Sequence, residues 1–288
     1  MRLDRVAGAP ISWGVCEVPG WGHQTDPAVV LTEMRELGLT ATEFGPIGFL
    51  PDEPASKAAT LAAYDLRAVG GFLPLVLHDA DRDPLPRVDA YLDSCLAAGA
   101  GVVVLAAATG AEGYDTRPAL DRAQWHTLLS TLDRLAARAA ERGVVAAVHP
   151  HVGTVVETRD EVQRVLAGSD VGLCLDTGHL MVGGTDPVAL AAEHAGRVAH
   201  VHLKDVDGTL AARVLAGDLA FADAVRSRLF RPFGKGDVDI AAIVRGLEAT
   251  GYTGWYVVEQ DVMLGGEDPG GPRADMASCL DYLRAVDA

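Results

Sequence analysis

The sequence lacks the features of a disulfide-stabilised or membrane-spanning chain. Its four cysteines are scattered without paired spacing, and no apolar run approaches the roughly 20 residues that a membrane span requires. The chain also opens without the charged and then apolar segment of a secretory leader. These absences predict a cytoplasmic protein in a reducing compartment, with no membrane partner.

Basic residues are also scarce, because 24 Lys and Arg face 40 Asp and Glu, giving a formal net charge of −16. Such a charge repels polyphosphate, so we expect no nucleic-acid partner. No Gly-x-Gly-x-x-Gly follows the first predicted strand, so nothing supports a bound dinucleotide. One basic cluster, Arg226, Arg228 and Arg231, either binds a phosphate or a neighbouring chain or consists of solvated helix residues.

Apolar runs of strand length alternate with helical patterns along the whole chain. We expect strands at Val6–Ser12, Thr40–Phe44, Phe72–His78, Val102–Ala107, Val144–His149, Val171–Asp176, Val198–Leu203 and Trp255–Glu259. Eight such units without a linker favour a closed (β/α)8 TIM barrel, an α/β fold, over an open sheet. The length of 288 residues is that of one barrel, so residues 1–288 are predicted to form a single domain.

Helix signals occupy the intervals between these strands. Thr25–Pro27 and Thr185–Pro187 each supply a capping residue followed by proline at the first helical position. Residues 121–142 and 237–250 carry apolar stripes of helical period that stop at a glycine. These stretches are predicted as helices that cover the barrel.

Two connections are longer than usual for this fold. Residues 108–118 are polar and glycine-bearing, and residues 205–236 are long enough to hold a short helix near 219–228. Both follow strands, so both lie over the face where barrel active sites are found. We interpret the second connection as a lid or a subunit contact, which raises a homo-oligomer as one outcome.

The stretch Val198–Asp205 carries the strongest chemical signal. Its residues alternate strictly, so that His200, His202 and Lys204 share one side of a strand and apolar residues share the other. Buried imidazoles and an ammonium need polar partners, so a chemical site is the leading interpretation. The alternative is a half-exposed antiparallel strand.

Other predicted strands end in similar residues. The polar residues at strand ends are Glu43, His78, His149, His151, Asp176, His202 and Glu259. Carboxylates and imidazoles that converge without thiolate suit Mn²⁺, Co²⁺, Mg²⁺ or Fe²⁺, with Zn²⁺ also open. His179, on the turn after Asp176, could be a ligand, a proton carrier or a substrate contact.

Several motifs resemble one known family. The stretches Asp176–His179, His200–Asp205, Phe233–Asp239 and Gly254–Asp261 are similar to the xylose-isomerase-like TIM-barrel superfamily. Within it, Ala9–Gly14 and His149–Thr154 most resemble the inosose (2-keto-myo-inositol) dehydratases. The resemblance runs from the first strand to the last and implies a metal-dependent enzyme acting on a sugar or polyol.

The resemblance also implies a ligand set, with one departure. The superfamily holds its metal with Glu, Asp, His and Glu from strands five to eight, and the last three map onto Asp176, His202 and Glu259. At the first position this chain has His149, or His151 two residues on; Glu157 is an alternative carboxylate that more readily opens the next helix. Mn²⁺ or Co²⁺ is the expected metal.

The departure bears on the reaction. The epimerases of the superfamily pass a proton between paired glutamates, whereas a β-elimination needs one base beside a carbonyl and one acid at the leaving hydroxyl. Glu259 would act as ligand or as ligand and base. His151, His179 and Lys204 are candidates for proton transfer, and Lys204 could also neutralise an enediolate.

Three residues are expected to bind substrate. Trp13 would form an apolar wall against a sugar ring or a plug of the barrel, and Glu43 and then His78 would bind hydroxyl groups. The loop Trp21–His23 either closes over the ligand or lies on the surface.

The predicted function is therefore dehydration of inosose or a related polyhydroxy ketone by a carbon–oxygen lyase. The nearest alternative is a sugar or sugar-phosphate isomerase or epimerase. A damage-specific endonuclease of this fold is disfavoured by the charge of −16, because it needs a basic groove. A catalytically silent sugar-binding barrel is the third alternative, and it should not bind a divalent metal.

Overall fold

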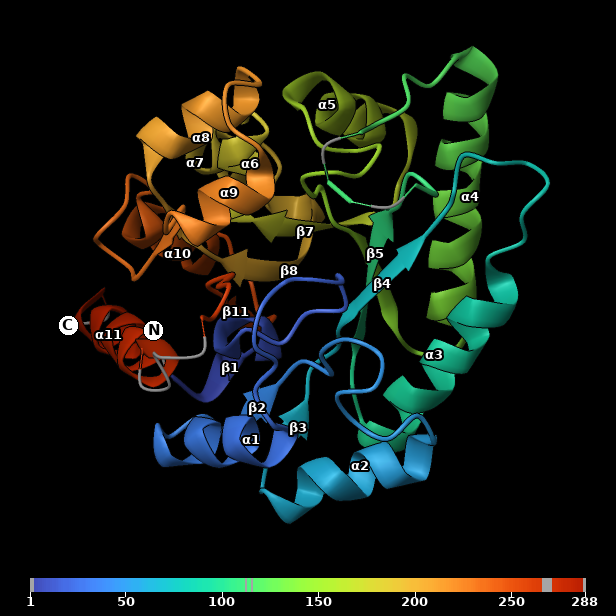
Figure 1. Cartoon of the computed structure of the whole chain (residues 1–288). Coiled ribbons are helices and arrows are strands. Elements are labelled where there is room, and N and C mark those ends of the chain that lie inside the picture. The colour runs from blue at the N-terminus through green and yellow to red at the C-terminus, as the bar shows by residue number, and fades with distance from the viewer. Residues whose placement is uncertain (1–2, 112, 115, 266–270, 287–288) are drawn as a thin grey trace.

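The structure, a computed structural model, describes residues 3–111, 113–114, 116–265 and 271–286. Within these residues nine strands form one sheet in the order β3-β2-β1-β11-β8-β7-β6-β5-β4, and neighbouring strands are parallel (Figure 1). The strands are β1 (Val6–Gly8), β2 (Ala41–Thr42), β3 (Arg67–Ala68), β4 (Phe72–Leu75), β5 (Val102–Ala107), β6 (Val145–Val148), β7 (Gly172–Asp176), β8 (Val198–Leu203) and β11 (Tyr256–Val258). All eight predicted strand regions contribute to this sheet.

The two end strands of this order, β3 and β4, are consecutive in the chain and close the ring. Between them, the amide of Phe44 donates to the carbonyl of Gly70 and the amide of Val104 donates to that of Gly71, both at 3.0 Å. Gly70 has φ of 155°, and a Cβ there would lie 2.5 Å from the Val102 carbonyl oxygen. The bend therefore requires glycine, and β3 and β4 together act as one barrel strand. The predicted TIM barrel is confirmed.

Helices surround the sheet (Figure 1). They are α1 (Pro27–Glu36), α2 (Pro54–Ala63), α3 (Leu85–Ala98), α4 (Arg122–Glu141), α5 (Arg159–Gly168), α6 (Thr177–Val182), α7 (Pro187–Glu193), α8 (Gly208–Leu215), α9 (Phe221–Arg226), α10 (Ile240–Ala249) and α11 (Gly271–Val286). The predicted caps are confirmed, since Asp26 accepts from the amide of Ala28 and Asp186 from those of Val188 and Ala189. Apolar residues of the helices pack against the outer face of the sheet and form the main core.

The first strand is shorter than predicted. It covers Val6–Gly8, and a 3-10 helix, η2 (Pro10–Trp13), follows it. Pro10 has no amide hydrogen for a sheet hydrogen bond, and the amide of Ser12 donates back to the carbonyl of Ala9 at 3.1 Å. The change of direction at Pro10 turns Trp13 away from the barrel axis.

The long connection after β8 is folded. It contains α8, α9 and a two-stranded antiparallel sheet of β9 (Asp205–Val206) and β10 (Phe230–Arg231). The buried carboxylate of Asp205 holds it together by accepting hydrogen bonds from the amides of Val206, Gly234, Gly236 and Val238. The predicted short helix near 219–228 is present as α9.

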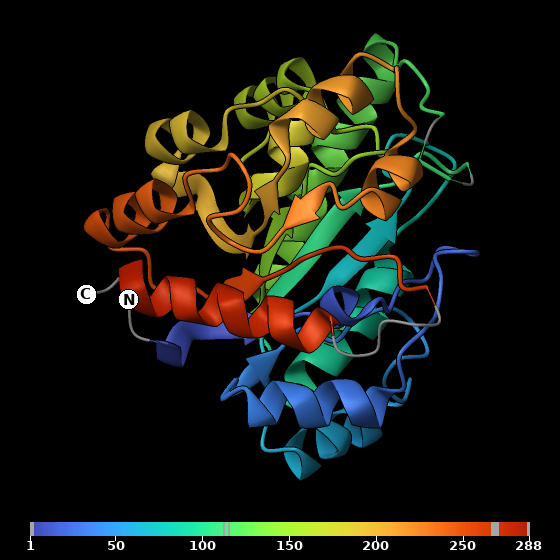
Figure 2. The ribbon, with the colours of Figure 1, turned by 60° about the vertical axis from the view of Figure 1, so that its left-hand side comes forward.

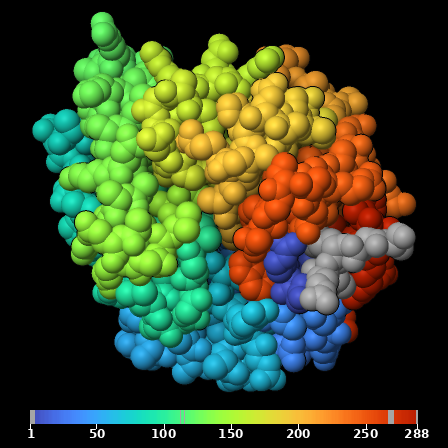
Figure 3. Space-filling view, turned by 180° about the vertical axis from the view of Figure 1, so that it is seen from behind, coloured from blue at the N-terminus to red at the C-terminus, as the bar shows by residue number. Residues whose placement is uncertain are grey.

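The N-terminal and C-terminal segments of the described chain lie on the same side of the barrel. Helix α11 lies beside η2 (Figures 1 and 2), and Arg5 bonds to Glu248 at 2.6 Å, where the N-terminal segment touches the C-terminal part of the surface (Figure 3). Among the described helices, none is long and apolar enough to cross a membrane.

Candidate metal centre

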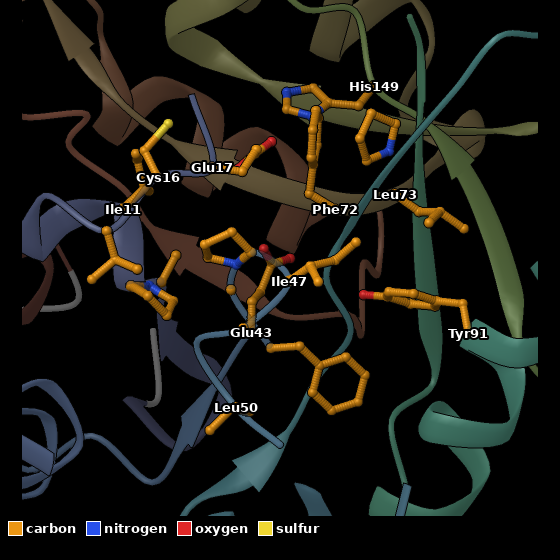
Figure 4. A pocket seen from close by; sticks show the side chains of 18 of the residues that line it. Ile11, Cys16, Glu17, Glu43, Ile47, Leu50, Phe72, Leu73, Tyr91 and His149 are labelled. Atoms are coloured by element: carbon orange, nitrogen blue, oxygen red, sulfur yellow. The ribbon is translucent and has the colours of Figure 1, made fainter. Parts of the chain in front are cut away.

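A cavity of about 360 Å³ lies at the carboxyl ends of the strands. The ionisable residues that line it include Glu43, His149, His151, His202, Lys204, Glu259 and Asp261. Figure 4 shows Glu43 and His149 reaching into this cavity, with Phe72, Ile47 and Tyr91 on the remaining walls. The cavity therefore has one polar side and one largely apolar side.

Three predicted ligands meet at the polar side. Asp176, His202 and Glu259 offer ligand atoms that all lie within 4.8 Å of one another. The Nδ1 atom of His202 is 3.4 Å from Asp176 Oδ2 and 3.3 Å from Glu259 Oε2, yet this buried atom makes no hydrogen bond. Two carboxylates and an imidazole nitrogen facing one point suit a divalent cation.

His149, directly after β6, contacts one of these three residues. Its Nε2 atom is 3.1 Å from Asp176 Oδ2, and burial lowers the pKa of His149 to about 3, so the ring is neutral and able to ligate. Glu157 instead accepts a hydrogen bond from the amide of Gly153 and pairs with Arg117 at 3.1 Å, just before α5. Of the alternatives for the first ligand, the structure brings His149 to Asp176.

Asp176 ends β7 and starts α6. Its Oδ1 atom accepts hydrogen bonds from the amides of Gly178 and His179, at 2.9 and 2.8 Å, and so caps the helix. Its Oδ2 atom faces the other candidate ligands. The cap fixes the carboxylate at the one position where its second oxygen points into the centre.

Glu43, at the end of β2, lies behind His202. Its Oε1 atom accepts hydrogen bonds from Nε2 of His200 at 2.8 Å and Nε2 of His202 at 3.0 Å. Burial favours the neutral acid, but the His202 and His200 imidazoles outweigh it and lower the pKa of Glu43. This contact would orient His202, because a ligating imidazole commonly donates its other N–H to a carboxylate. The contact of Glu43 with a substrate hydroxyl stays a prediction, since Glu43 also lines the cavity.

Lys204 lies at the centre of three carboxylates. Its Nζ atom is 3.1 Å from Asp176 Oδ2, 2.9 Å from Glu259 Oε2 and 3.0 Å from Asp261 Oδ1. Burial disfavours the charged ammonium, but these carboxylates, Asp176 first, raise the pKa of Lys204 well above its ordinary value. Burial raises the pKa of Glu259 to about 7 despite its cationic neighbours.

His151 and His179 pack together with a ring separation of 3.7 Å. The peptide group of Val152 sets both tautomers, because its carbonyl lies 2.7 Å from Nδ1 of His151 and its amide donates to Nδ1 of His179 at 3.4 Å. His151 therefore carries its proton on Nδ1 and leaves Nε2 as an acceptor. His179 carries its proton on Nε2, which is 3.5 Å from Asp261 Oδ2.

Aromatic residues from three separate segments of the chain pack around this pair. Tyr114 stacks on His151 with ring centroids 5.8 Å apart, and it contacts Trp21 at 5.9 Å and Phe221 at 5.2 Å. The first long connection thus contributes Tyr114 to the cavity lining, and the second contributes Phe221, which packs on Tyr114 and His179. Sequence reasoning did not single out Tyr114, because an aromatic residue in a polar loop gives no periodic signal.

Two predicted substrate contacts do not reach the cavity. The buried indole of Trp13 donates to Glu33 Oε2 at 2.7 Å and lines a separate groove beside α1, because η2 turns it outward. His78 lies beyond the end of β4, which stops at Leu75, and is absent from the described cavity lining. Trp21 takes the wall position expected of Trp13. Asp261 was not predicted as a site residue. The one sequence signal for it is its position two residues after Glu259, which places both side chains on the same side of an extended segment.

The basic cluster of the long connection is paired internally. Its ion pairs are Arg226–Asp223 at 2.7 Å, Arg228–Asp275 at 2.9 Å and Arg231–Asp207 at 2.9 Å. These arginines are absent from the described lining of the cavity. Each arginine thus has a carboxylate partner within the chain, and only Arg226 lies on a helix.

Comparison with known proteins agrees with this arrangement. The family model described as "Xylose isomerase-like TIM barrel" matches residues 31–285. The chain belongs to this family. The family assignment agrees with the resemblance that the strand-end motifs predicted.

Curated relatives align over most of the chain. The rhizopine catabolism protein MocC of Rhizobium meliloti is 38% identical over 270 residues, covering 89% of this chain and 81% of the relative. An inosose dehydratase of Geobacillus kaustophilus is 33% identical over 270 residues, covering 89% and 87%. An inosose dehydratase of Erwinia tasmaniensis is 30% identical, covering 89% and 90%.

Solved structures share the fold at lower identity. An L-ribulose 3-epimerase superposes with a TM-score of 0.70 and 18% identity, covering 98% of this chain and 94% of that one. The IOLI protein, solved with a bound zinc atom, gives a TM-score of 0.69 at 15% identity, covering 98% and 97%. These likenesses establish the barrel architecture.

Proposed function

We propose that this chain is a metal-dependent dehydratase that removes water from inosose or a closely related polyhydroxy ketone. The observation that carries the proposal is the unequal pair at the ends of β6 and β11, His149 and Glu259, on a chain whose curated relatives include inosose dehydratases. Epimerisation calls for matched acid and base groups on the two faces of a carbon. An elimination does not, so the unequal pair favours dehydration.

Asp176, His202, Glu259 and His149 would hold the cation, with Mn²⁺ or Co²⁺ preferred and Mg²⁺, Fe²⁺ or Zn²⁺ as alternatives. Their oxygen and nitrogen donors suit these ions, and the unbonded Nδ1 of His202 gives a ligand atom without another partner. When bound, the ion would polarise the ketone and stabilise negative charge on the adjoining oxygen.

His151 is the proposed base. Its Nδ1 is engaged with the carbonyl of Val152, so Nε2 is the acceptor nitrogen, and the residue lines the cavity. It would take the proton from the carbon next to the ketone, and that electron pair would form the new carbon–carbon double bond. His179, held by Asp261, would orient the stacked His151 ring.

Lys204 is the proposed acid. Its ammonium lies at the cavity and would donate a proton to the leaving hydroxyl as the carbon–oxygen bond breaks, releasing one water. The same positive charge would stabilise the enediolate before the hydroxyl leaves. Glu259 remains an alternative base.

The test uses purified protein, Mn²⁺ or Co²⁺, and a panel of inososes, ketohexoses and sugar phosphates. We expect an enone-type ultraviolet absorption and the mass loss of one water with an inosose. The sugar isomerase or epimerase alternative, which the fold likeness to epimerases favours, predicts conversion without mass change. Isomerisation of a ketohexose without any dehydration would replace the proposal.

A further inference from the structure

The ammonium of Lys204 occupies a closed anionic environment. The side chain is 3% exposed, and its ammonium forms ion pairs with Asp176, Glu259 and Asp261 at 2.9 to 3.1 Å. Its Nζ also lies 5.5 Å from the centre of the Phe230 ring. Its stem packs on Gly178, where an added Cβ would approach Lys204 Cβ to 2.6 Å. The lysine is therefore built into the site rather than resting at its edge.

Two of its three partners are oxygens of the candidate metal centre. Asp176 Oδ2 and Glu259 Oε2, which receive the ammonium, are also the atoms that face Nδ1 of His202. The third partner, Asp261, belongs to none of the candidate ligand clusters found among the described residues. The ammonium thus shares the ligand oxygens and also has one partner of its own.

We propose that Lys204 competes with the divalent cation for Asp176 and Glu259, and that Asp261 retains the ammonium once the cation is bound. This inference rests on the metal centre of the proposed function and does not depend on the substrate.

Charge and confinement give the physical reason. A cation on these two oxygens withdraws their negative charge from the ammonium and places like charges close together in a poorly solvated site, where repulsion is strong. The confined stem limits the movement of the ammonium, and Asp261 is its one carboxylate partner outside the candidate ligand clusters of the described residues, so Asp261 is the carboxylate left to pair with it. Metal loading would then leave a charged donor beside the cavity at the position proposed for the acid.

The test measures Mn²⁺ affinity without substrate, after chelator treatment, from the loss of the free-ion signal in electron paramagnetic resonance. Lys204→Met should bind Mn²⁺ more tightly than wild type by roughly tenfold or more, because one competing charge is gone. Lys57→Met is the matched control: Lys57 lines the same cavity, but its Nζ bonds to Ser94 at 3.3 Å, so its loss should leave Mn²⁺ affinity unchanged.

Lys204→Gln guards against a folding defect in the methionine variant, and it should also bind Mn²⁺ more tightly. Unchanged or weaker affinity in the folded Lys204 variants would overturn the competition. If no variant binds Mn²⁺, both the inference and the metal centre fail. Tighter Mn²⁺ binding by the Lys204 variants, together with no dehydration of inosose by the wild type, would remove the proposed function and leave the inference standing.

A double-mutant cycle tests the part assigned to Asp261. Asp261→Asn should weaken Mn²⁺ binding more in the wild-type background than in Lys204→Met. Only the wild type has an ammonium that must pair with Asp261 when the cation binds. Equal losses in the two backgrounds would show that Asp261 acts only through its charge, and the retaining role would be wrong.

Discussion

At the scale of single residues, the candidate centre depends on side chains that serve two partners at once. Asp176 caps α6 with Oδ1 and faces the other ligands with Oδ2. His202 presents Nδ1 to the centre and donates from Nε2 to Glu43. Each of these residues makes one contact that supports the fold and one contact within the candidate metal centre. Two different substitutions at the same position can therefore separate the two roles.

For Asp176 the informative pair is asparagine and alanine. Asp176→Asn keeps an oxygen that can accept from the α6 amides, whereas Asp176→Ala removes the cap, so alanine should be the less stable by about 1 kcal/mol or more. Both should lose Mn²⁺ binding and turnover, because neither carries a carboxylate. Urea unfolding and metal titration make the comparison. Equal stabilities would mean that the cap contributes nothing, and activity in either variant would remove Asp176 from the ligand set.

For Glu43 the prediction separates orienting a ligand from binding a substrate. Glu43→Gln should weaken Mn²⁺ binding about 10- to 100-fold, the usual effect of losing the carboxylate behind a ligating histidine. A role in substrate binding alone would leave metal affinity unchanged and raise only KM. Glu193→Gln, an exposed substitution of the same charge on α7, is the control, and both proteins are titrated with metal in the absence of substrate.

At the scale of elements, the strands were predictable where a largely apolar run set them, as in β5 and β7. Alternation along β8 correctly placed His202 and Lys204 inside the barrel. The predicted end of the first strand was wrong. Pro10 has no amide hydrogen for the sheet, so the chain forms η2 there and Trp13 points outward. Glu43 was expected near the site, but its bond to His202 joins residues 159 positions apart, and no local pattern reports such a pairing.

The connection after β5 supplies an element-scale prediction. Tyr114 lies against Gly153, where an added Cβ would approach the Tyr114 ring to 2.6 Å and its Cα to 2.8 Å. Gly153→Ala should therefore displace Tyr114 from His151 and lower kcat/KM at least tenfold. Gly143→Ala is the matched control, because its φ of 72° is close to the 79° of Gly153 and nothing lies within 4 Å of its added Cβ.

Both alanine variants carry backbone strain of about 1 kcal/mol, and Gly153→Ala adds the cost of moving Tyr114. Their activities should differ, and this difference isolates the position of Tyr114 from general destabilisation. Steady-state kinetics and thermal unfolding of both proteins provide the comparison. Equal activity of the two variants would mean that Tyr114 plays no part in arranging His151.

At the scale of the whole molecule, the order of the strands in the sheet is what brings the centre together. Asp176 and Glu259 are 83 positions apart in the sequence. They lie close together because β7, β8 and β11 are neighbours in the sheet. Like the whole chain, which has a net charge of −16, the site holds more carboxylates than ammonium groups around Lys204. A divalent cation there would neutralise part of that charge and connect three strands.

The corresponding prediction concerns the stability of the entire chain. A ligand that binds only the folded protein stabilises it by about 2.7 kcal/mol at 100 times its dissociation constant, which for a chain of this size is a rise in Tm on the order of 5 °C. Mn²⁺ or Co²⁺ should therefore raise the Tm of chelator-treated wild type, and Asp176→Asn and Glu259→Gln should lose that rise while still unfolding cooperatively. Differential scanning calorimetry makes the measurement, with Glu193→Gln expected to respond like wild type. A silent sugar-binding barrel predicts no shift in any of the four proteins, and a shift that persists in Glu259→Gln would place the cation away from β11.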